Sequence, residues 1–282
     1  MRQMHLHKYG YLRLSETDLR FVVQTVATQR TDHEHVMDIV RDKPDFLEQM
    51  LDDDTLFRRL VDDEEAIVRV SPWLLFTVML RRAAKDLPRE RFTIERIGTT
   101  GRVPVFDSER VASLLHDRAV RDYLADMLAS FVRTESAVFY YRSGRRYRRR
   151  SFSDLDVDDM IAMAESVAAE YRFPFYRRIG DICLFVAGVF PEHVLAGYSG
   201  GAALHAGPSR RGRRRRSLEE YEAEAERFYS LAASHPEAGR AGVGDVLATL
   251  AVNFGLARKP INYITDRYIR LHKARLFGQA NR

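Results

Sequence analysis

Along most of the chain, apolar residues recur every three or four positions, a period typical of amphipathic helices. The first such stripe covers residues 19–26 and follows Ser15 and Asp18, which fit a helix N-cap with an acidic residue three positions on. The same period predicts helices over 32–51 (broken at Pro44), 52–65, 71–87, 108–117, 117–133, 156–170, 174–190, 217–234, 244–256 and 260–277. We therefore predict a mainly α fold, a multi-helix globular protein with one or two small β-hairpins.

Two segments alternate apolar and polar residues, which is typical of strands. Residues 92–97 and 103–106 form one predicted hairpin around a turn at 99–101, with Pro104 on an edge strand. The second covers 137–152 and turns at Ser143-Gly144, which would pair Tyr140 with Tyr147. That register would also set Arg142 opposite Arg145, an unfavourable pair of like charges.

The helix predicted at 71–87 begins at Ser71-Pro72 and is apolar on nearly all sides in its first turns. This pattern predicts a central, buried helix. A winged-helix arrangement, with this helix as the DNA-reading element before the first hairpin, is disfavoured because so apolar a helix would not lie exposed in a groove.

The chain divides in sequence into two parts. Residues 1–135 form a predicted N-terminal helical region, strongly acidic over 32–65, with a hairpin near 91–106. Residues 136–282 form a C-terminal helical region with an Arg-rich hairpin (137–152) and an Arg-rich loop (197–217). No long linker separates the two, so they could share one core.

Composition narrows the class of protein. Of 282 residues, 45% are hydrophobic and 30% charged, which excludes global disorder, and a single cysteine, Cys183, excludes a disulfide scaffold. The longest apolar runs, 73–80 and 182–190, fall short of the ~20 residues of a membrane-spanning helix. With no apolar signal segment at the start, we predict a cytoplasmic protein without a membrane span.

Positive charge is concentrated in two short segments. Lys+Arg number 45 against 40 Asp+Glu, for a net charge of +5. Twelve arginines lie in a first arginine tract (142–150) and a second arginine tract (210–216). Without these tracts, acidic residues outnumber basic ones, so the rest of the protein is acidic.

Arginine tracts beside aromatic residues suit a polyanion, because guanidinium forks match phosphate and aromatic rings stack on bases. A two-stranded ribbon can also enter the major groove of DNA. The candidate residues are Arg142, Arg145, Arg146, Tyr147, Arg148, Arg149, Arg150, Arg210, Arg211, Arg213, Arg214, Arg215 and Arg216. We predict a non-enzymatic protein that binds a polyanion, in the first place nucleic acid, through the Arg-rich hairpin and loop.

Two alternatives stay open. The arginines could pair with the acidic stretch 32–65 of the same or another copy, which would make the protein a structural or adaptor homo-oligomer. An enzyme could use Asp181 and Asp245 with Tyr176, although both aspartates follow an Ile/Val-Gly pair and are more simply explained as helix N-caps.

Two familiar patterns are weak. Gly197-Tyr-Ser-Gly-Gly201 has the spacing of a nucleophile elbow but lacks the preceding strands, so a Gly/Ser loop is the simpler interpretation. Residues 154–165 have the spacing of a calcium loop, but Asp159 replaces the required Gly, which favours a helix start capped by Ser153 or Asp154. The chain has no CxxC, Walker A, GxGxxG or HExxH pattern, and we predict no metal, cofactor or catalytic residue.

Overall fold

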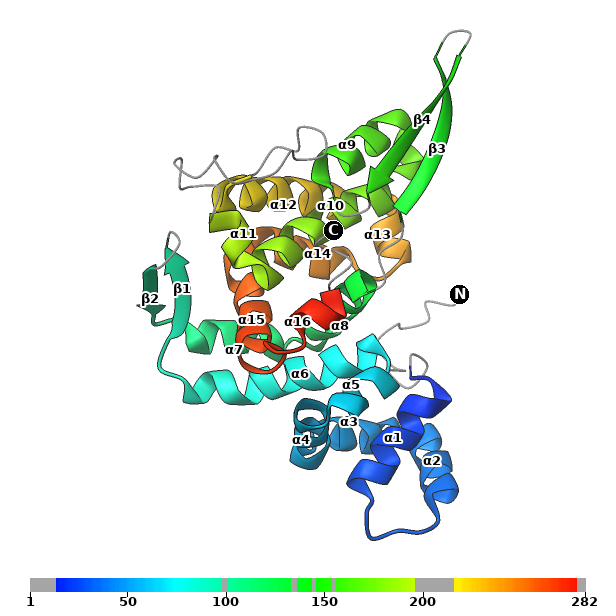
Figure 1. Cartoon of the computed structure of the whole chain (residues 1–282), viewed down its shortest axis with the longest axis vertical. Helices are drawn as coiled ribbons and strands as arrows, with labels where there is room; N and C mark the ends of the chain where they lie inside the picture. Colours follow the sequence, from blue (N-terminus) through cyan, green and yellow to red (C-terminus); the bar gives the residue numbers. More distant parts are fainter. Residues whose placement is uncertain are drawn as a thin grey trace. The chain divides into compact units, whose positions relative to one another are not determined.

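The computed structural model describes residues 14–97, 101–132, 136–143, 146–153, 156–195 and 216–277. Helices make up most of this part, together with two two-stranded antiparallel sheets (Figure 1), which confirms the predicted mainly α fold with small hairpins. No helix among the described residues is long and apolar enough to cross a membrane.

Contacts divide the chain into two compact units, neither of them continuous in sequence. Unit 1 comprises Met1–Glu90, Glu109–Val132 and Tyr263–Gly278, and unit 2 comprises Arg91–Ser108, Arg133–Asn262 and Gln279–Arg282. The first hairpin therefore belongs with the C-terminal elements, and the last helical turns belong with the N-terminal ones. The division at 135/136 stays a prediction about folding domains.

Unit 1 begins with a run of short helices, each opened by a local signal. Their bounds are α1 (Glu16–Val26), α2 (His33–Asp42), α3 (Pro44–Leu51), α4 (Asp54–Asp62) and α5 (Glu64–Arg69). Ser15 and Asp18 form a reciprocal capping box at α1, and Pro44 separates α2 from α3 as predicted. Asp53 and Asp63 cap α4 and α5 by accepting backbone N–H bonds.

Helix α6 (Pro72–Asp86) is the core of unit 1. Ser71 caps it, Pro72 occupies its first position, and the residues from Leu74 to Leu80 are all buried. It packs against α8 (Arg118–Val132), and Phe76 stacks on Phe277 of α16 (Lys273–Phe277) with ring centroids 5.8 Å apart. The remaining elements are the 3₁₀ helix η3 (Leu87–Arg89) and α7 (Ser108–His116). The burial of Leu74 to Leu80 confirms the prediction that this helix is central.

Unit 2 is built around α10 (Phe173–Val189) and α12 (Leu218–Ala233), which lie side by side (Figure 1). A Cβ added at Gly180 of α10 would lie 2.6 Å from Cδ1 of Tyr229, so glycine permits this close approach. The other elements are α9 (Val157–Ser166), η4 (Ala169–Tyr171), α11 (Pro191–Leu195), α13 (Pro236–Arg240), α14 (Gly244–Val252) and α15 (Phe254–Arg267).

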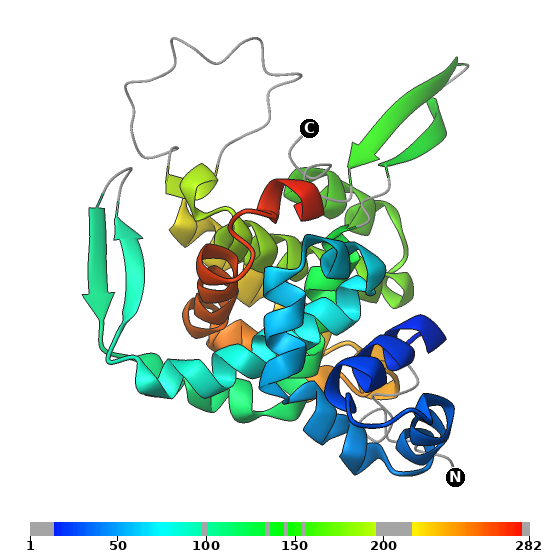
Figure 2. The ribbon, with the colours of Figure 1, turned by 60° about the horizontal axis from the view of Figure 1, so that its bottom comes forward.

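The first hairpin, β1 (Thr93–Ile97) with β2 (Gly101–Val105), is attached to α15 by a partly buried ionic cluster. Lys259, whose side chain is 6% exposed, pairs with Asp107 and with Glu95, the latter at 2.8 Å. Arg258 pairs with Glu95 at 3.1 Å, and Nζ of Lys259 donates to Oγ1 of Thr93 at 3.3 Å. Two cations therefore meet two carboxylates, and the cluster is balanced. Figure 2 shows the two strands as a narrow arm.

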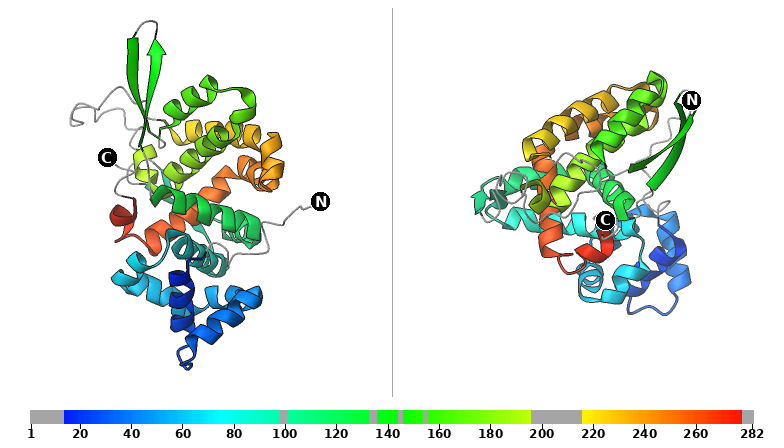
Figure 3. Two further views of the ribbon diagram at one scale, coloured as in Figure 1. Left: turned by 90° about the vertical axis from the view of Figure 1, so that its right-hand side faces the viewer. Right: turned by 45° about the horizontal axis from the view of Figure 1, so that its top comes forward.

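The second hairpin, β3 (Ser136–Ser143) with β4 (Arg146–Ser153), projects from the helices of unit 2 (Figure 3). Its register corrects the prediction, since Tyr140 pairs with Arg149 rather than with Tyr147. Arg142 consequently lies opposite Tyr147 instead of Arg145. This pairing avoids like charges directly across the ladder, which is its physical advantage over the predicted register.

The helix predicted over 174–190 ends at Val189 with Phe190 as its C-cap, and Pro191 then opens α11, where its missing N–H costs nothing. Pro260 was expected to begin the last helix, yet it lies inside α15, which starts at Phe254. The break falls instead at Asn253, the C-cap of α14. Burial of Ile261 and Ala257 on the same helix compensates for the hydrogen bond that Pro260 cannot donate.

Candidate anion-binding sites

The first arginine tract occupies β4 and the end of β3. The ladder sets Arg148, Arg149 and Arg150 directly opposite Tyr141, Tyr140 and Phe139, and it sets Arg146 opposite Ser143. Arg145 lies outside the described residues. A row of arginine positions on one strand therefore runs beside a row of aromatic positions on the other.

The second arginine tract is described only at Arg216, since Arg210, Arg211 and Arg213–Arg215 lie outside the described residues. The side chain of Arg216 is 8% exposed, and its Nη2 donates to Oδ1 of Asp158 at 2.6 Å. Burial lowers the pKa of this guanidinium, but the hydrogen bond and charge of Asp158 outweigh burial and raise the pKa overall. Arg216 is thus neutralised within the protein, and we leave it out of the proposed polyanion surface.

The carboxylates that resembled a calcium loop begin helix α9. Asp156 is the N-cap, and its Oδ1 accepts from the N–H groups of Asp158 and Asp159 at 3.0 and 3.1 Å. The cap is therefore Asp156, two residues beyond the predicted Asp154, because its side chain reaches both free N–H groups of the first turn. Among the described residues, no group of three or more His, Cys, Asp or Glu side chains could hold a metal ion. The Gly197–Gly201 motif lies outside the described residues.

Asp181 and Asp245 occupy different environments. Asp181 is buried in the middle of α10 and accepts a hydrogen bond from Oη of Tyr229 at 2.9 Å. Asp245 is exposed in the first turn of α14. Neither is an N-cap, because both lie inside their helices. Tyr176 packs its ring against Phe228, at 5.8 Å between centroids. Asp181 thus has a structural partner, Tyr229, that the enzyme hypothesis did not include.

Carboxylates of the acidic N-terminal stretch pair with arginines of unit 1. The pairs are Glu16 and Asp38 with Arg41, Asp32 with Arg30, Glu34 with Arg20, Glu48 and Asp52 with Arg81, Asp54 with Arg82, and Glu65 with Arg69. Two further aspartates, Asp53 and Asp63, are helix caps. Much of this negative charge is therefore already used locally.

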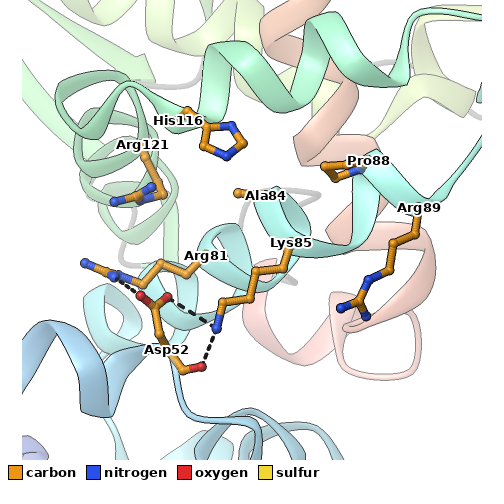
Figure 4. A pocket seen from close by; sticks show the side chains of 8 residues that line it. All are labelled: Asp52, Arg81, Ala84, Lys85, Pro88, Arg89, His116 and Arg121. Atoms are coloured by element: carbon orange, nitrogen blue, oxygen red, sulfur yellow. Dashed lines mark hydrogen bonds and ion pairs between the residues drawn. The ribbon is translucent and has the colours of Figure 1, made fainter.

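Unit 1 also holds a cavity of about 370 Å³ with a cationic lining. The lining residues are Asp52, Arg81, Ala84, Lys85, Pro88, Arg89, His116 and Arg121. In Figure 4, Arg121 and His116 lie on one side of Ala84. Lys85 and Arg89 lie on the other side. Four Lys or Arg side chains thus surround the cavity, with Asp52 as the one carboxylate in its lining.

The cations of this cavity differ in their partners. Arg81, 5% exposed, pairs with Glu48 and, at 3.0 Å, with Asp52. Burial lowers the pKa of Arg81, but these two carboxylates outweigh burial and raise it overall. Lys85 also lies near Asp52, with Nζ 3.8 Å from its Oδ1.

Arg121 has no ion pair with a carboxylate among the described residues. Its Nη1 donates to the backbone carbonyl of Leu115 at 3.1 Å, and its Nε is buried without a partner. Burial and the neighbouring charge of Arg81 lower the pKa of Arg121, so local carboxylates do not fully compensate this guanidinium. Arg89 is exposed and likewise forms no ion pair with the described residues. The cavity therefore carries a surplus of positive charge.

Sequence analysis missed this cavity, although one signal was present. Arg81 and Lys85 are four residues apart, so a helix places them on one face, whereas Arg89 lies beyond the end of α6, in η3. The first turns of this helix are strongly apolar and predict a core role, whereas its C-terminal turns are basic. His116 and Arg121 come from the next two helices, and their approach to that face depends on packing.

Comparisons with known protein families, with curated proteins and with solved structures each found no match. The functional argument therefore starts from the arrangement of charges alone.

Proposed function

We propose that this protein is a non-enzymatic binding protein that contacts nucleic acid through the β3–β4 ribbon and the arginines at 210–215. The observation that carries the proposal is the ladder of the ribbon, which sets Arg148, Arg149 and Arg150 beside aromatic positions over successive residues. Each strand has eight residues and spans roughly 25 Å at ~3.3 Å per residue, enough to follow several phosphates.

The use of the acidic stretch supports this proposal over internal pairing. The adaptor alternative requires carboxylates that accept the arginine tracts. Glu48, Asp52 and Asp54, among others, already pair with Arg81 and Arg82 of their own unit. An ion pair between a tract arginine and one of these carboxylates would require an existing ion pair to break, so its net contribution to stability would be small. A foreign polyanion is therefore the better partner for the arginine tracts.

Salt-dependent binding tests the proposal. Fluorescence anisotropy with labelled single-stranded and duplex oligonucleotides measures the affinity of the full chain between 50 and 200 mM salt. A protein that makes about 6–10 phosphate contacts loses roughly 10³–10⁵ in affinity as the salt concentration rises over this range. We expect the triple substitution Arg148→Gln, Arg149→Gln, Arg150→Gln to weaken binding and to lower the slope of log K against log salt by about 3.

A matched control removes the same charge elsewhere. Arg58, Arg227 and Arg240 lie on exposed helix surfaces, and their triple replacement by Gln should leave the slope nearly unchanged. Absence of binding at 50 mM salt, or an equal loss in the control, would overturn the proposal. An increase in molecular mass that disappears at high salt, without oligonucleotide binding, would favour the adaptor alternative.

A further inference from the structure

We propose that the cavity of unit 1 binds the phosphate group of a small phosphorylated molecule through Arg121, Arg89 and Lys85. This site is separate from the arginine tracts, and the inference does not rest on the proposed function. No lining residue of the cavity belongs to either tract.

The first argument is the unbalanced charge of the lining. A buried cation normally has a carboxylate partner, because an unpaired desolvated charge is costly. Arg81 follows this rule by pairing with Glu48 and Asp52. Arg121 has no carboxylate partner among the described residues, and its Nη1 donates to a backbone carbonyl, that of Leu115. An anion in the cavity would supply the missing negative charge.

The second argument is the origin and type of the cationic groups. Lys85 and Arg89 come from α6 and η3, and Arg121 comes from α8, so the three approach the cavity from two directions (Figure 4). Guanidinium forks bind phosphate oxygens in pairs, and a lysine adds a point charge. His116 lines the same cavity, and its Nδ1 is 2.7 Å from the carbonyl oxygen of Ala112, which fixes its ring.

Charge and size select the ligand class. With Asp52 as the one carboxylate in the lining, the cavity favours an anion of more than one charge over a simple carboxylate. Its volume of about 370 Å³ lies within the ~300–1,000 Å³ of small-molecule sites, so a phosphate with an attached organic group has room.

Calorimetric titration of the full chain with pyrophosphate, at constant ionic strength, tests the inference. We expect saturable binding by the wild type and affinities at least about tenfold weaker for Arg89→Ala and for Arg121→Ala, since each variant removes a charge-assisted hydrogen bond to the anion. Arg89 is exposed and without an ion pair among the described residues, so its replacement leaves the fold intact even if Arg121→Ala unfolds.

Two control variants separate this site from general attraction to positive charge. Arg58→Ala removes an exposed arginine of α4 and should bind pyrophosphate like the wild type. The triple Gln variant of Arg148, Arg149 and Arg150 should also keep pyrophosphate binding, even if it has lost oligonucleotides. No binding by the wild type, an equal loss in Arg58→Ala, or acetate binding as tight as pyrophosphate would overturn the inference.

Discussion

The two units differ in how far their clustered cations are balanced by carboxylates. In unit 2, Lys259 and Arg258 meet Glu95 and Asp107, and every charge has an opposite partner. In unit 1, the cavity lining combines Arg81, Lys85, Arg89 and Arg121 with Asp52 alone. The second group of cations lines an open volume of about 370 Å³.

This difference separates structural charge from binding charge. A balanced cluster neutralises its own charges and fixes the hairpin β1–β2 on α15, so removing a member leaves a partly buried charge without its partner. A surplus of one sign around a cavity leaves acceptor positions for a ligand and is maintained at some cost to the empty protein. Substitutions in the two clusters should therefore have opposite consequences for stability and binding.

The largest effect should come from Lys259→Met. The substitution leaves the partly buried Asp107 without its cation, while Glu95 keeps Arg258, and we expect a loss of about 3 kcal/mol in the free energy of unfolding. Urea denaturation followed by circular dichroism measures this loss. Arg58→Met, which removes an exposed cation, should change stability by less than about 0.5 kcal/mol. A loss below about 1 kcal/mol for Lys259→Met would mean that the cluster does not hold the hairpin.

An intermediate effect, dependent on pH, is expected for Glu95→Gln. Burial raises the pKa of Glu95, but the hydrogen bond from Lys259 and the charges of Arg258 and Lys259 outweigh it, so the pKa is lowered overall. A carboxyl group whose pKa falls on folding contributes stability above its unfolded pKa, about 4.3, and this contribution disappears as the pH falls through the folded value.

The wild type should therefore exceed Glu95→Gln by roughly 1–2 kcal/mol at pH 7, and the difference should shrink below about pH 4. Denaturation curves of both proteins at several pH values measure it. The same difference at pH 3.5 and pH 7 would show that the charge of Glu95 has no role in stability.

The smallest effect on stability should come from Arg121→Met. The variant loses one hydrogen bond to Leu115 but also removes an uncompensated charge beside Arg81, and the two changes offset each other to within about 1 kcal/mol. Thermal unfolding without pyrophosphate measures the change in stability, and thermal unfolding with pyrophosphate measures the response to the ligand. We expect pyrophosphate to raise the melting temperature of the wild type and not that of the variant. A destabilisation as large as that of Lys259→Met would place Arg121 among the structural cations.

Much of the fold could be predicted from local patterns. The capping residues Ser15, Ser71 and Ser217 each lie at the start of a predicted helix, because a cap acts on N–H groups only two or three residues away. The break at Pro191 was predicted, but Pro260 was expected to begin a helix and lies inside α15, since the cost of a proline in a helix depends on what the neighbouring residues bury.

The candidate sites were predictable to a lesser degree. The arginine tracts are visible in the sequence as runs, but the ladder that pairs Arg149 with Tyr140 required the backbone. The pairing of Arg216 with Asp158 joins residues 58 positions apart, and no local pattern predicts it. Helical spacing could have shown that Arg81 and Lys85 share a face. The approach of Arg121 to that face could not be predicted.

The sequence alone determined the helices, the hairpins and the concentration of arginine, because hydrophobic period, capping and turn chemistry act over a few residues. Tertiary packing decided which charges are neutralised. Asp52 and Glu48 of one helical segment reach Arg81 of another and leave Arg121 without a carboxylate, an outcome that depends on how distant helices pack. The electrostatic balance at each site is thus a property of the folded chain, because it depends on distances of a few ångströms between residues far apart in sequence.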